Sequence, residues 1–162
     1  VIVGIAVLLT LAATLFASTT GTDADWVVKL IDVFPPEVRS NPELGGYQLM
    51  VSADILRGRY RGSLEHPKPS EPGVVAPYRV RMPEANHTFL PGHRIMVQVQ
   101  SSWFPLYDRN PQTFVTNIAK AEPGTYRSAT HRIWLAPGQA SYVELPMVGA
   151  RNLIPLATKL AE

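Results

Sequence analysis

The sequence predicts an all-β protein in which two sheets pack together as a jelly-roll sandwich. Fifteen prolines and eleven glycines are spread over the 162 residues and divide the chain into short pieces. Between these breaks, apolar and polar residues alternate with period two. No twelve-residue window after residue 22 sustains the 3.6-residue period of a helix. Seven or eight short strands with long irregular connections are typical of a sandwich.

The first 22 residues carry no charge and are long enough to cross a membrane as a helix, and they resemble the apolar part of a signal peptide. A signal peptide opens with positive charge, which this stretch lacks, and hydroxyl residues dilute its second half. We therefore expect a buried strand over residues 10–18, entered from an apolar lead. A membrane is not an expected partner, and a membrane span or leader is the alternative.

The central strands follow from alternation and from turn residues. "DWVVKLIDVF" (25–34) is a half-buried strand that Pro35 and Pro36 end. In "GYQLMVSADILRGRYR" (46–61), we expect a bulge at Gly58. The residues of this segment that we expect on one face are Tyr47, Leu49, Val51, Ala53 and Ile55.

The later strands alternate in the same way. In "VVAPYRVRMP" (74–83), Tyr78, Val80 and Met82 are expected to point inward. "HTFLPGHRIMVQVQ" (87–100) contains a Pro-Gly turn followed by a strand with one apolar face, formed by Ile95, Val97 and Val99. "THRIWL" and "ASYVELP" are two short strands joined by "APGQ".

The composition narrows the classes of function. A hydrophobic content of 46% with 17% charged residues is that of a globular chain, and the length suits one domain. The net charge is +2 and the basic residues are scattered, so nucleic acid is not an expected partner. Arg57, Arg59 and Arg61 alternate along one strand, which we interpret as a solvated edge. The absence of cysteine excludes disulfides and thiolate metal sites, and leaves the cellular compartment open.

The stretch "SSWFPLYDRNPQTF" (101–114) is unusual for a connection between strands. Three aromatic residues before an Asp-Arg-Asn triplet are costly to leave in water, so we expect the loop to pack either against another domain or over the end of the sandwich core. Interfaces are enriched in aromatic residues and arginine. In the docking interpretation, Asp108 pairs with Arg109, and Asn110 satisfies backbone groups. The candidate interface residues are Trp103, Phe104, Tyr107, Asp108, Arg109 and Asn110.

Four stretches together resemble a known domain: "STTGTDADWVVKLIDVFP", "GYQLMVSADILRGRYR", "HTFLPGHRIMVQVQSSWFPLYDRNPQT" and "ASYVELP". In this order they resemble the C-terminal jelly roll of the CocE/NonD serine hydrolases, also called the X-Pro dipeptidyl-peptidase C-terminal domain. Within this family, the chain is most similar to α-amino-acid ester hydrolases and glutaryl-cephalosporanate acylases. The resemblance implies a galactose-binding-domain-like jelly roll over residues 10–147, an apolar lead over 1–9 and a tail over 148–162.

The resemblance also implies a partner, the α/β-hydrolase catalytic domain of the same polypeptide. The catalytic serine, aspartate and histidine of this mostly bacterial family belong to that domain, and its members would be secreted, periplasmic or cytoplasmic. This chain contains no G-x-S-x-G nucleophile elbow. We therefore expect no catalytic residue among His66, His87, His93 and His131, no metal and no cofactor. An apolar surface that lacks its partner makes a homo-oligomer a second expectation.

Two ligand hypotheses compete with this interpretation. In "TGTDADW", Thr22, Asp23 and Asp25 could coordinate calcium. A hairpin turn in which the Asp side chains cap backbone amides explains the same pattern better. Trp103 could also stack on a sugar beside the polar residues 108–110, which would make the chain a stand-alone carbohydrate- or surface-binding module.

Overall fold

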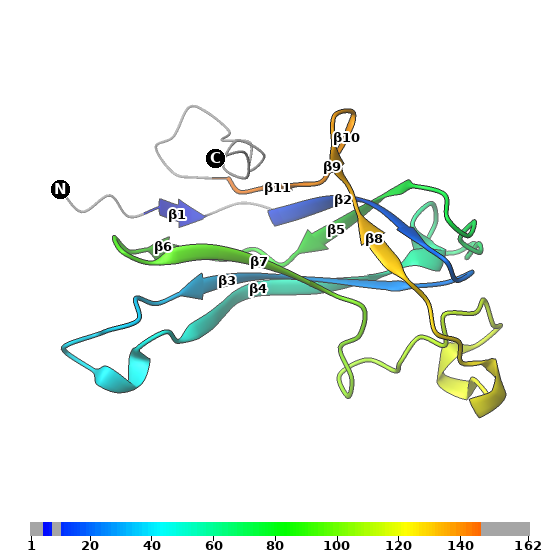
Figure 1. The fold of residues 1–162 in the computed structure, drawn as a ribbon, viewed down its shortest axis with the longest axis horizontal. Coiled ribbons are helices and arrows are strands. Elements are labelled where there is room, and N and C mark those ends of the chain that lie inside the picture. Colours follow the sequence, from blue (N-terminus) through cyan, green and yellow to red (C-terminus); the bar gives the residue numbers. More distant parts are fainter. Residues whose placement is uncertain (1–4, 8–10, 147–162) are drawn as a thin grey trace.

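The computed structural model describes residues 5–7 and 11–146. Two antiparallel sheets lie one above the other, as Figure 1 shows, so the predicted all-β sandwich is confirmed. Its similarity to galactose-binding domains stays a prediction. The strands are β1 (Ile5–Val7), β2 (Leu11–Thr19), β3 (Asp25–Val33), β4 (Gln48–Arg57), β5 (Ala76–Met82), β6 (His87–Phe89), β7 (Arg94–Gln100), β8 (His131–Ile133), β9 (Leu135–Ala136), β10 (Gln139–Ala140) and β11 (Tyr142–Glu144).

Helical structure in the described residues consists of four single-turn 3₁₀ helices. These are η1 (Pro42–Leu44), η2 (Gly58–Tyr60), η3 (Ile118–Lys120) and η4 (Pro123–Thr125). Among the described residues, no helix has the length and apolar character needed to cross a membrane. The second half of the uncharged N-terminal stretch is the strand β2, as predicted.

The first sheet has the strand order β11-β2-β5, and β8 also pairs with β2. The second sheet has the order β4-β3-β7, and β1 pairs with β6 in a separate short ladder. The β9–β10 hairpin projects from the first sheet (Figure 1). Residues 147–162, which include the predicted tail, lie outside the described residues.

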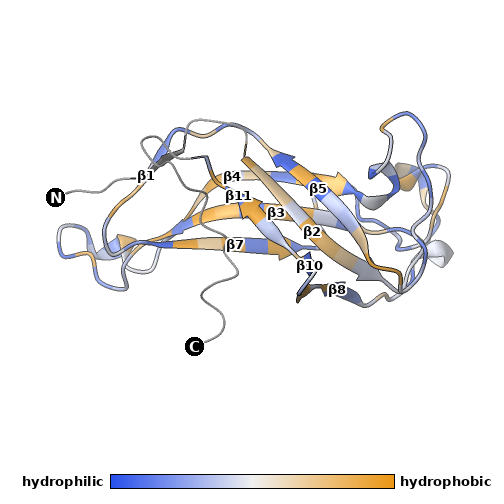
Figure 2. Ribbon diagram, turned by 90° about the horizontal axis from the view of Figure 1, so that it is seen from above, coloured by the Kyte–Doolittle hydropathy of each residue, from blue (hydrophilic) through white to orange (hydrophobic). Residues whose placement is uncertain are grey.

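The core fills the space between the two sheets. Alternate residues of β2 and β5 enter it, and Tyr78, Val80 and Met82 point inward as predicted. From the second sheet, the large side chain of Trp26 lies with its ring centroid 5.1 Å from that of Tyr78. Apolar colours run along the strands in Figure 2, which agrees with a core built from the strands. Other members of the cluster are Leu11, Ala13, Leu15, Ala17, Ala24, Val28, Leu30 and Phe89.

The predicted face of β4 is wrong, and a β-bulge is the reason. Leu30 pairs with Ser52 while Ile31 pairs with Met50, so Val51 is an extra residue in the ladder. An extra residue reverses the alternation beyond it. The five residues predicted to share one face are therefore divided between the two faces of the sheet.

Gly58 does not form the bulge that we predicted there. It follows β4 as the first residue of η2, and its backbone N–H donates to the carbonyl of Ala24 over 2.6 Å. A Cβ atom at this position would lie 2.9 Å from the same carbonyl oxygen. The glycine is needed here because two backbone segments approach closely.

Candidate domain interface

The aromatic loop, residues 101–114, lies on the outer face of the second sheet, the face directed away from β2 and β5. Figure 1 shows the chain descending below this sheet after β7. The Nζ atom of Lys29 on β3 lies 5.0 Å from the centroid of the Trp103 ring, within the range of a cation–π contact. The rings of Trp103 and Tyr107 are 5.9 Å apart. The loop therefore packs beside the sheet and does not enter the core.

The base of the loop is fixed by a buried hydrogen bond. Asn110 Nδ2 donates to Asp25 Oδ1 over 2.8 Å, and both residues are buried. Asn110 Oδ1 accepts from the backbone N–H of Gln112 over 2.9 Å, which confirms the prediction that this side chain satisfies a backbone group. Burial raises the pKa of Asp25 to about 6, and the Asn110 hydrogen bond opposes this rise.

Hydrogen bonds donated by backbone N–H groups join the end of the loop to the β2–β3 turn. Thr22 N donates to Gln112 O over 3.1 Å, and Phe114 N donates to Thr22 Oγ1 over 2.8 Å. A Cβ atom on Gly21 would overlap the Gln112 carbonyl oxygen. The close approach of turn and loop therefore requires glycine at position 21.

A buried ion pair holds the next part of the chain. Arg59 Nη2 lies 2.7 Å from Asp23 Oδ2, and Arg59 Nε donates to the same oxygen over 2.8 Å. Arg59 Nη1 donates to the Val115 carbonyl over 2.8 Å, and the guanidinium lies over the Phe114 ring. The predicted solvated edge is therefore wrong for Arg59, which is 3% exposed. Its charge is tolerated in the interior because Asp23 pairs with it.

The same contacts occupy the residues proposed above as calcium ligands. Asp23 Oδ1 accepts from the Ala24 N–H over 2.9 Å, as the capping interpretation predicted. The remaining oxygen of Asp23 faces Arg59, and Asp25 is bonded to Asn110. The described residues contain no group of three or more histidines and carboxylates suited to a metal ion.

The exposed part of the loop is apolar at its tip. Phe104 is 64% exposed and Leu106 is 65% exposed, while Trp103 and Tyr107 are half-buried.

The expected pairing of Asp108 with Arg109 is wrong within the described part of the chain. The Arg109 guanidinium instead lies over the Tyr126 ring at 5.5 Å, and the Asp108 carbonyl accepts from Arg57 Nη2 over 3.3 Å.

This arrangement is unfavourable to a sugar site at Trp103. A sugar platform needs polar groups that are free to bond the ligand. Asn110 is 5% exposed and bonded to Asp25, and Arg109 is directed at Tyr126. Lys29 lies over the Trp103 ring. Two of the three polar residues that the carbohydrate hypothesis requires, Arg109 and Asn110, are thus engaged by other parts of the chain.

Two of the four histidines form a cluster with Asp32 that the sequence did not predict. Asp32, which is 1% exposed, lies 2.9 Å from His87 Nε2 and 2.8 Å from His93 Nδ1. The two histidines flank the predicted Pro-Gly turn. Their spacing around this turn is the only feature of the sequence that indicates the cluster. A hydrolase triad also needs a hydroxyl bonded to the imidazole. No serine or threonine side chain bonds His87 or His93 among the described residues.

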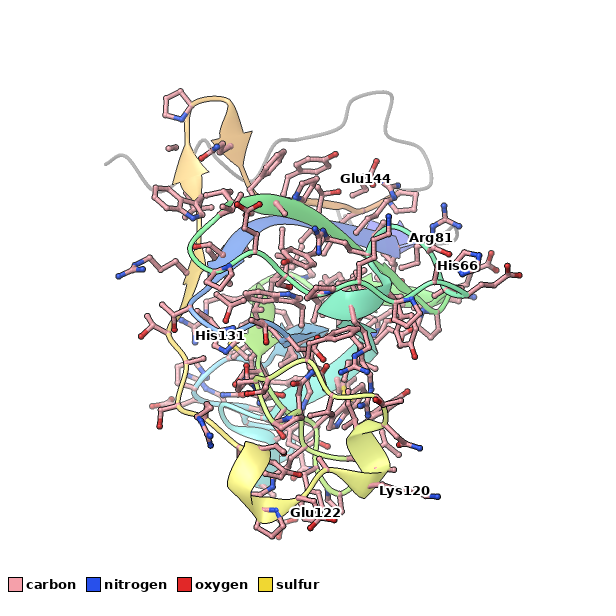
Figure 3. The ribbon with its side chains drawn as sticks, turned by 90° about the vertical axis from the view of Figure 1, so that its right-hand side faces the viewer. His66, Arg81, Lys120, Glu122, His131 and Glu144 are labelled. Atoms are coloured by element: carbon pink, nitrogen blue, oxygen red, sulfur yellow. The ribbon has the colours of Figure 1, made fainter. Side chains whose placement is uncertain are left out.

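The other two histidines lie far from this cluster. The His131 ring meets the Trp26 ring edge-on at 5.2 Å, and burial lowers the pKa of the imidazole. His66 is exposed in a loop, and Figure 3 shows His66 and His131 on opposite sides of the sandwich. The histidines are therefore not brought together at one site.

These observations define a β-sandwich domain with an anchored aromatic loop. A model of the X-Pro dipeptidyl-peptidase C-terminal non-catalytic domain matches residues 10–144, and the chain belongs to this family. A cocaine esterase from Rhodococcus sp. (strain MB1 Bresler) is 38% identical over 139 residues, which are 86% of this chain and 22% of that protein.

Two solved structures are also similar to this chain. One is an aminopeptidase from the marine sediment archaeon Thaumarchaeota archaeon, with 59% identity and a TM-score of 0.87 over 90% of this chain and 24% of that chain. The other is an α-amino acid ester hydrolase labelled with selenomethionine, with 55% identity and a TM-score of 0.86 over 89% of this chain and 24% of that chain. The chain thus spans less than a quarter of the length of these relatives.

Proposed function

We propose that this chain is the accessory domain of a CocE/NonD-type serine hydrolase and that it packs against the α/β-hydrolase domain of the same polypeptide. In that polypeptide, the serine would be acylated by an ester or amide of a small acid, with α-amino acids as the favoured class, and then released to water. The sandwich would hold the catalytic and cap domains together and help to shape the substrate cleft.

The aromatic loop is the observation that carries this proposal. Buried side chains fix its base, yet its tip directs Phe104 and Leu106 into solvent. An ordered loop with exposed apolar side chains is typical of a surface that another protein covers. The relatives support the same partner, because the matched region is less than a quarter of proteins named as esterase, aminopeptidase and ester hydrolase.

The test replaces Phe104 and Leu106 together by serine in the complete hydrolase polypeptide that carries this domain. We expect kcat/KM to fall by about tenfold or more, because two interface anchors are lost. Leu64→Ser is the matched control, since Leu64 is 81% exposed in a different loop. Equal activity of the double variant and the control would contradict the proposal.

A second measurement distinguishes a loop that docks against another domain from a loop that packs over the end of its own sandwich core. In the isolated 162-residue chain, Phe104→Ser/Leu106→Ser should leave the free energy of unfolding within about 0.5 kcal/mol of wild type, because both side chains are exposed. A large loss in the isolated chain would show that the loop stabilises its own sandwich. The isolated wild-type chain should not hydrolyse p-nitrophenyl esters.

A further inference from the structure

The outer sheet face, the surface of the β4-β3-β7 sheet that is directed away from β2 and β5, is apolar along its central strand. The strand pairing places Val27, Ile31 and Val33 of β3 on this face, but these side chains are already buried within the chain, at 0%, 5% and 6% exposure, and offer no accessible area to a partner. Met50 lies opposite Ile31 and is 51% exposed, and Met96 lies opposite Ile31 on the other side. The accessible apolar side chain on this face is therefore Met50, and the half-buried Trp103 ring of the aromatic loop lies against Lys29 on the same face.

The charges of the outer sheet face are almost all positive. The register places three cations there: Arg57 opposite Asp25, Lys29 in the middle of β3 and Arg94 opposite Val33. The one carboxylate in these paired positions is Asp25, which is buried and bonded to Asn110. Asp108 in the adjacent loop is exposed and lies near Arg57, whose guanidinium bonds the Asp108 backbone carbonyl.

Lys29 occupies the centre of this surface without an anionic partner. Its neighbours across the ladder are Ala53 and Gln98, and none of the ion pairs found in the described residues includes Lys29. A domain placed over Trp103 and Met50 would remove water from the ammonium group. A desolvated ammonium is strongly unfavourable unless an acceptor replaces the lost water.

We propose that the hydrolase domain covers the outer sheet face with an apolar surface that places a carboxylate opposite Lys29. This inference rests on the proposed function and adds the surface and the charge of the partner. Continuity with the aromatic loop gives the location, and the cations at positions 29, 57 and 94 require a complementary acidic surface. Trp103 holds the ammonium in place before the domains meet.

The experiment measures the contacts of Lys29 in the complete hydrolase polypeptide with a zero-length carbodiimide cross-linker, which joins an amine only to a carboxylate in direct contact. Mass spectrometry should find Lys29 linked to an Asp or Glu outside this 162-residue chain. An amine-reactive label should modify Lys29 at least tenfold more slowly than Lys120. Lys120 is the control because it is exposed in η3, outside the paired strands, and Figure 3 shows it at the lower edge of the molecule.

Charge reversal provides an independent readout. Lys29→Glu should lower kcat/KM of the complete polypeptide by about tenfold, because like charges then meet in the interface, whereas Lys120→Glu should leave it unchanged. A Lys29 labelled as fast as Lys120 would overturn the inference. A protected Lys29 without a cross-link would overturn the carboxylate, and a link to a second copy of this chain would replace the hydrolase domain by a homo-oligomer.

These failures can be distinguished from failure of the proposed function. If the Phe104→Ser/Leu106→Ser variant loses activity while Lys29 remains freely labelled, docking through the loop stands and the outer sheet face is not part of it. If both the loop variant and Lys29→Glu are fully active, the proposed packing itself is wrong.

Discussion

Asn110 in the aromatic loop donates a hydrogen bond over 2.8 Å to Asp25 on β3, a residue 85 positions earlier in the chain. The Asp25 carboxylate is 1% exposed and the Asn110 side chain belongs to a residue that is 5% exposed. A side-chain hydrogen bond in the interior is not readily replaced by hydrogen bonds to water, so the base of the loop is fixed relative to the sheet. The exposed tip is thereby presented in one position, which is the property that a docking surface needs.

Removing this bond should destabilise the domain. Asn110→Ala leaves Asp25 buried without its hydrogen-bond donor, and we expect the free energy of unfolding to fall by about 1–3 kcal/mol. Urea denaturation of the isolated chain measures the change. Asn117→Ala is the control, because Asn117 caps the exposed 3₁₀ turn η3. Equal losses for the two variants would contradict the special role of Asn110.

The stability of the domain should depend on pH through Asp25. Burial raises the pKa of this carboxyl from its ordinary 3.8 to about 6 in the folded state. Between these two values, the folded state binds more protons than the unfolded state. The contribution of Asp25 to stability is therefore complete below about pH 4 and is lost as the pH rises through 6. At about 1.4 kcal/mol per pKa unit, the loss amounts to about 3 kcal/mol.

Asp25→Asn isolates this contribution, because the amide does not titrate and its carbonyl can still accept from Asn110. The unfolding free energy of the variant minus that of wild type should increase by up to about 3 kcal/mol between pH 4 and pH 7. A difference that stays constant over this range would show that Asp25 has the same pKa in both states. Chemical denaturation of both proteins at five or six pH values measures this difference in unfolding free energy.

The buried ion pair should be one of the most sensitive sites of the domain. Arg59→Met leaves Asp23 as an unpaired buried carboxylate and removes the bond to the Val115 carbonyl. We expect a loss of about 3–5 kcal/mol of unfolding free energy. Arg61→Met is the matched control, since Arg61 is exposed two residues later, and it should change stability by less than about 0.5 kcal/mol. A mild effect of Arg59→Met would indicate that water reaches the pair.

The contact between turn and loop can be tested at Gly21. Gly21→Ala places a methyl group against the Gln112 carbonyl and should displace the end of the aromatic loop, at a cost of about 1–3 kcal/mol. Gly124→Ala is the control, because a Cβ there has no neighbour within 4 Å. Hydrogen exchange of Thr22 N–H, which donates to Gln112, should accelerate in the first variant and not in the second.

Much of the fold can be predicted from the sequence, because strands depend on local features. Proline follows β3 and β5 and a Pro-Gly turn precedes β7, and period-two alternation identifies the inward residues Tyr78, Val80 and Met82. The prediction is wrong for β4, since a single bulge at Val51 reverses the alternation. Nothing in the residues around Val51 indicates this insertion, because its position depends on the pairing with β3.

The candidate site was predicted less completely than the fold. The aromatic composition of residues 101–114 identified the loop, and Asn110 was correctly expected to bond a backbone group. Its main partner Asp25, the stacking of Trp103 against Lys29 and the contact of Arg109 with Tyr126 were not foreseen. Each of these contacts joins segments that are distant in sequence.

The sequence by itself determined the class of fold, the positions of the main strands along the chain and membership of the family, because alternation, turn residues and motif order are local properties of the chain. Only the tertiary structure decided which charges are buried and what they contact. Arg57, Arg59 and Arg61 look equivalent along the sequence, yet only Arg59 turns inward to Asp23. The physical reason is that burial of a charge depends on a partner 36 residues away, whose position the packing of the whole sandwich fixes.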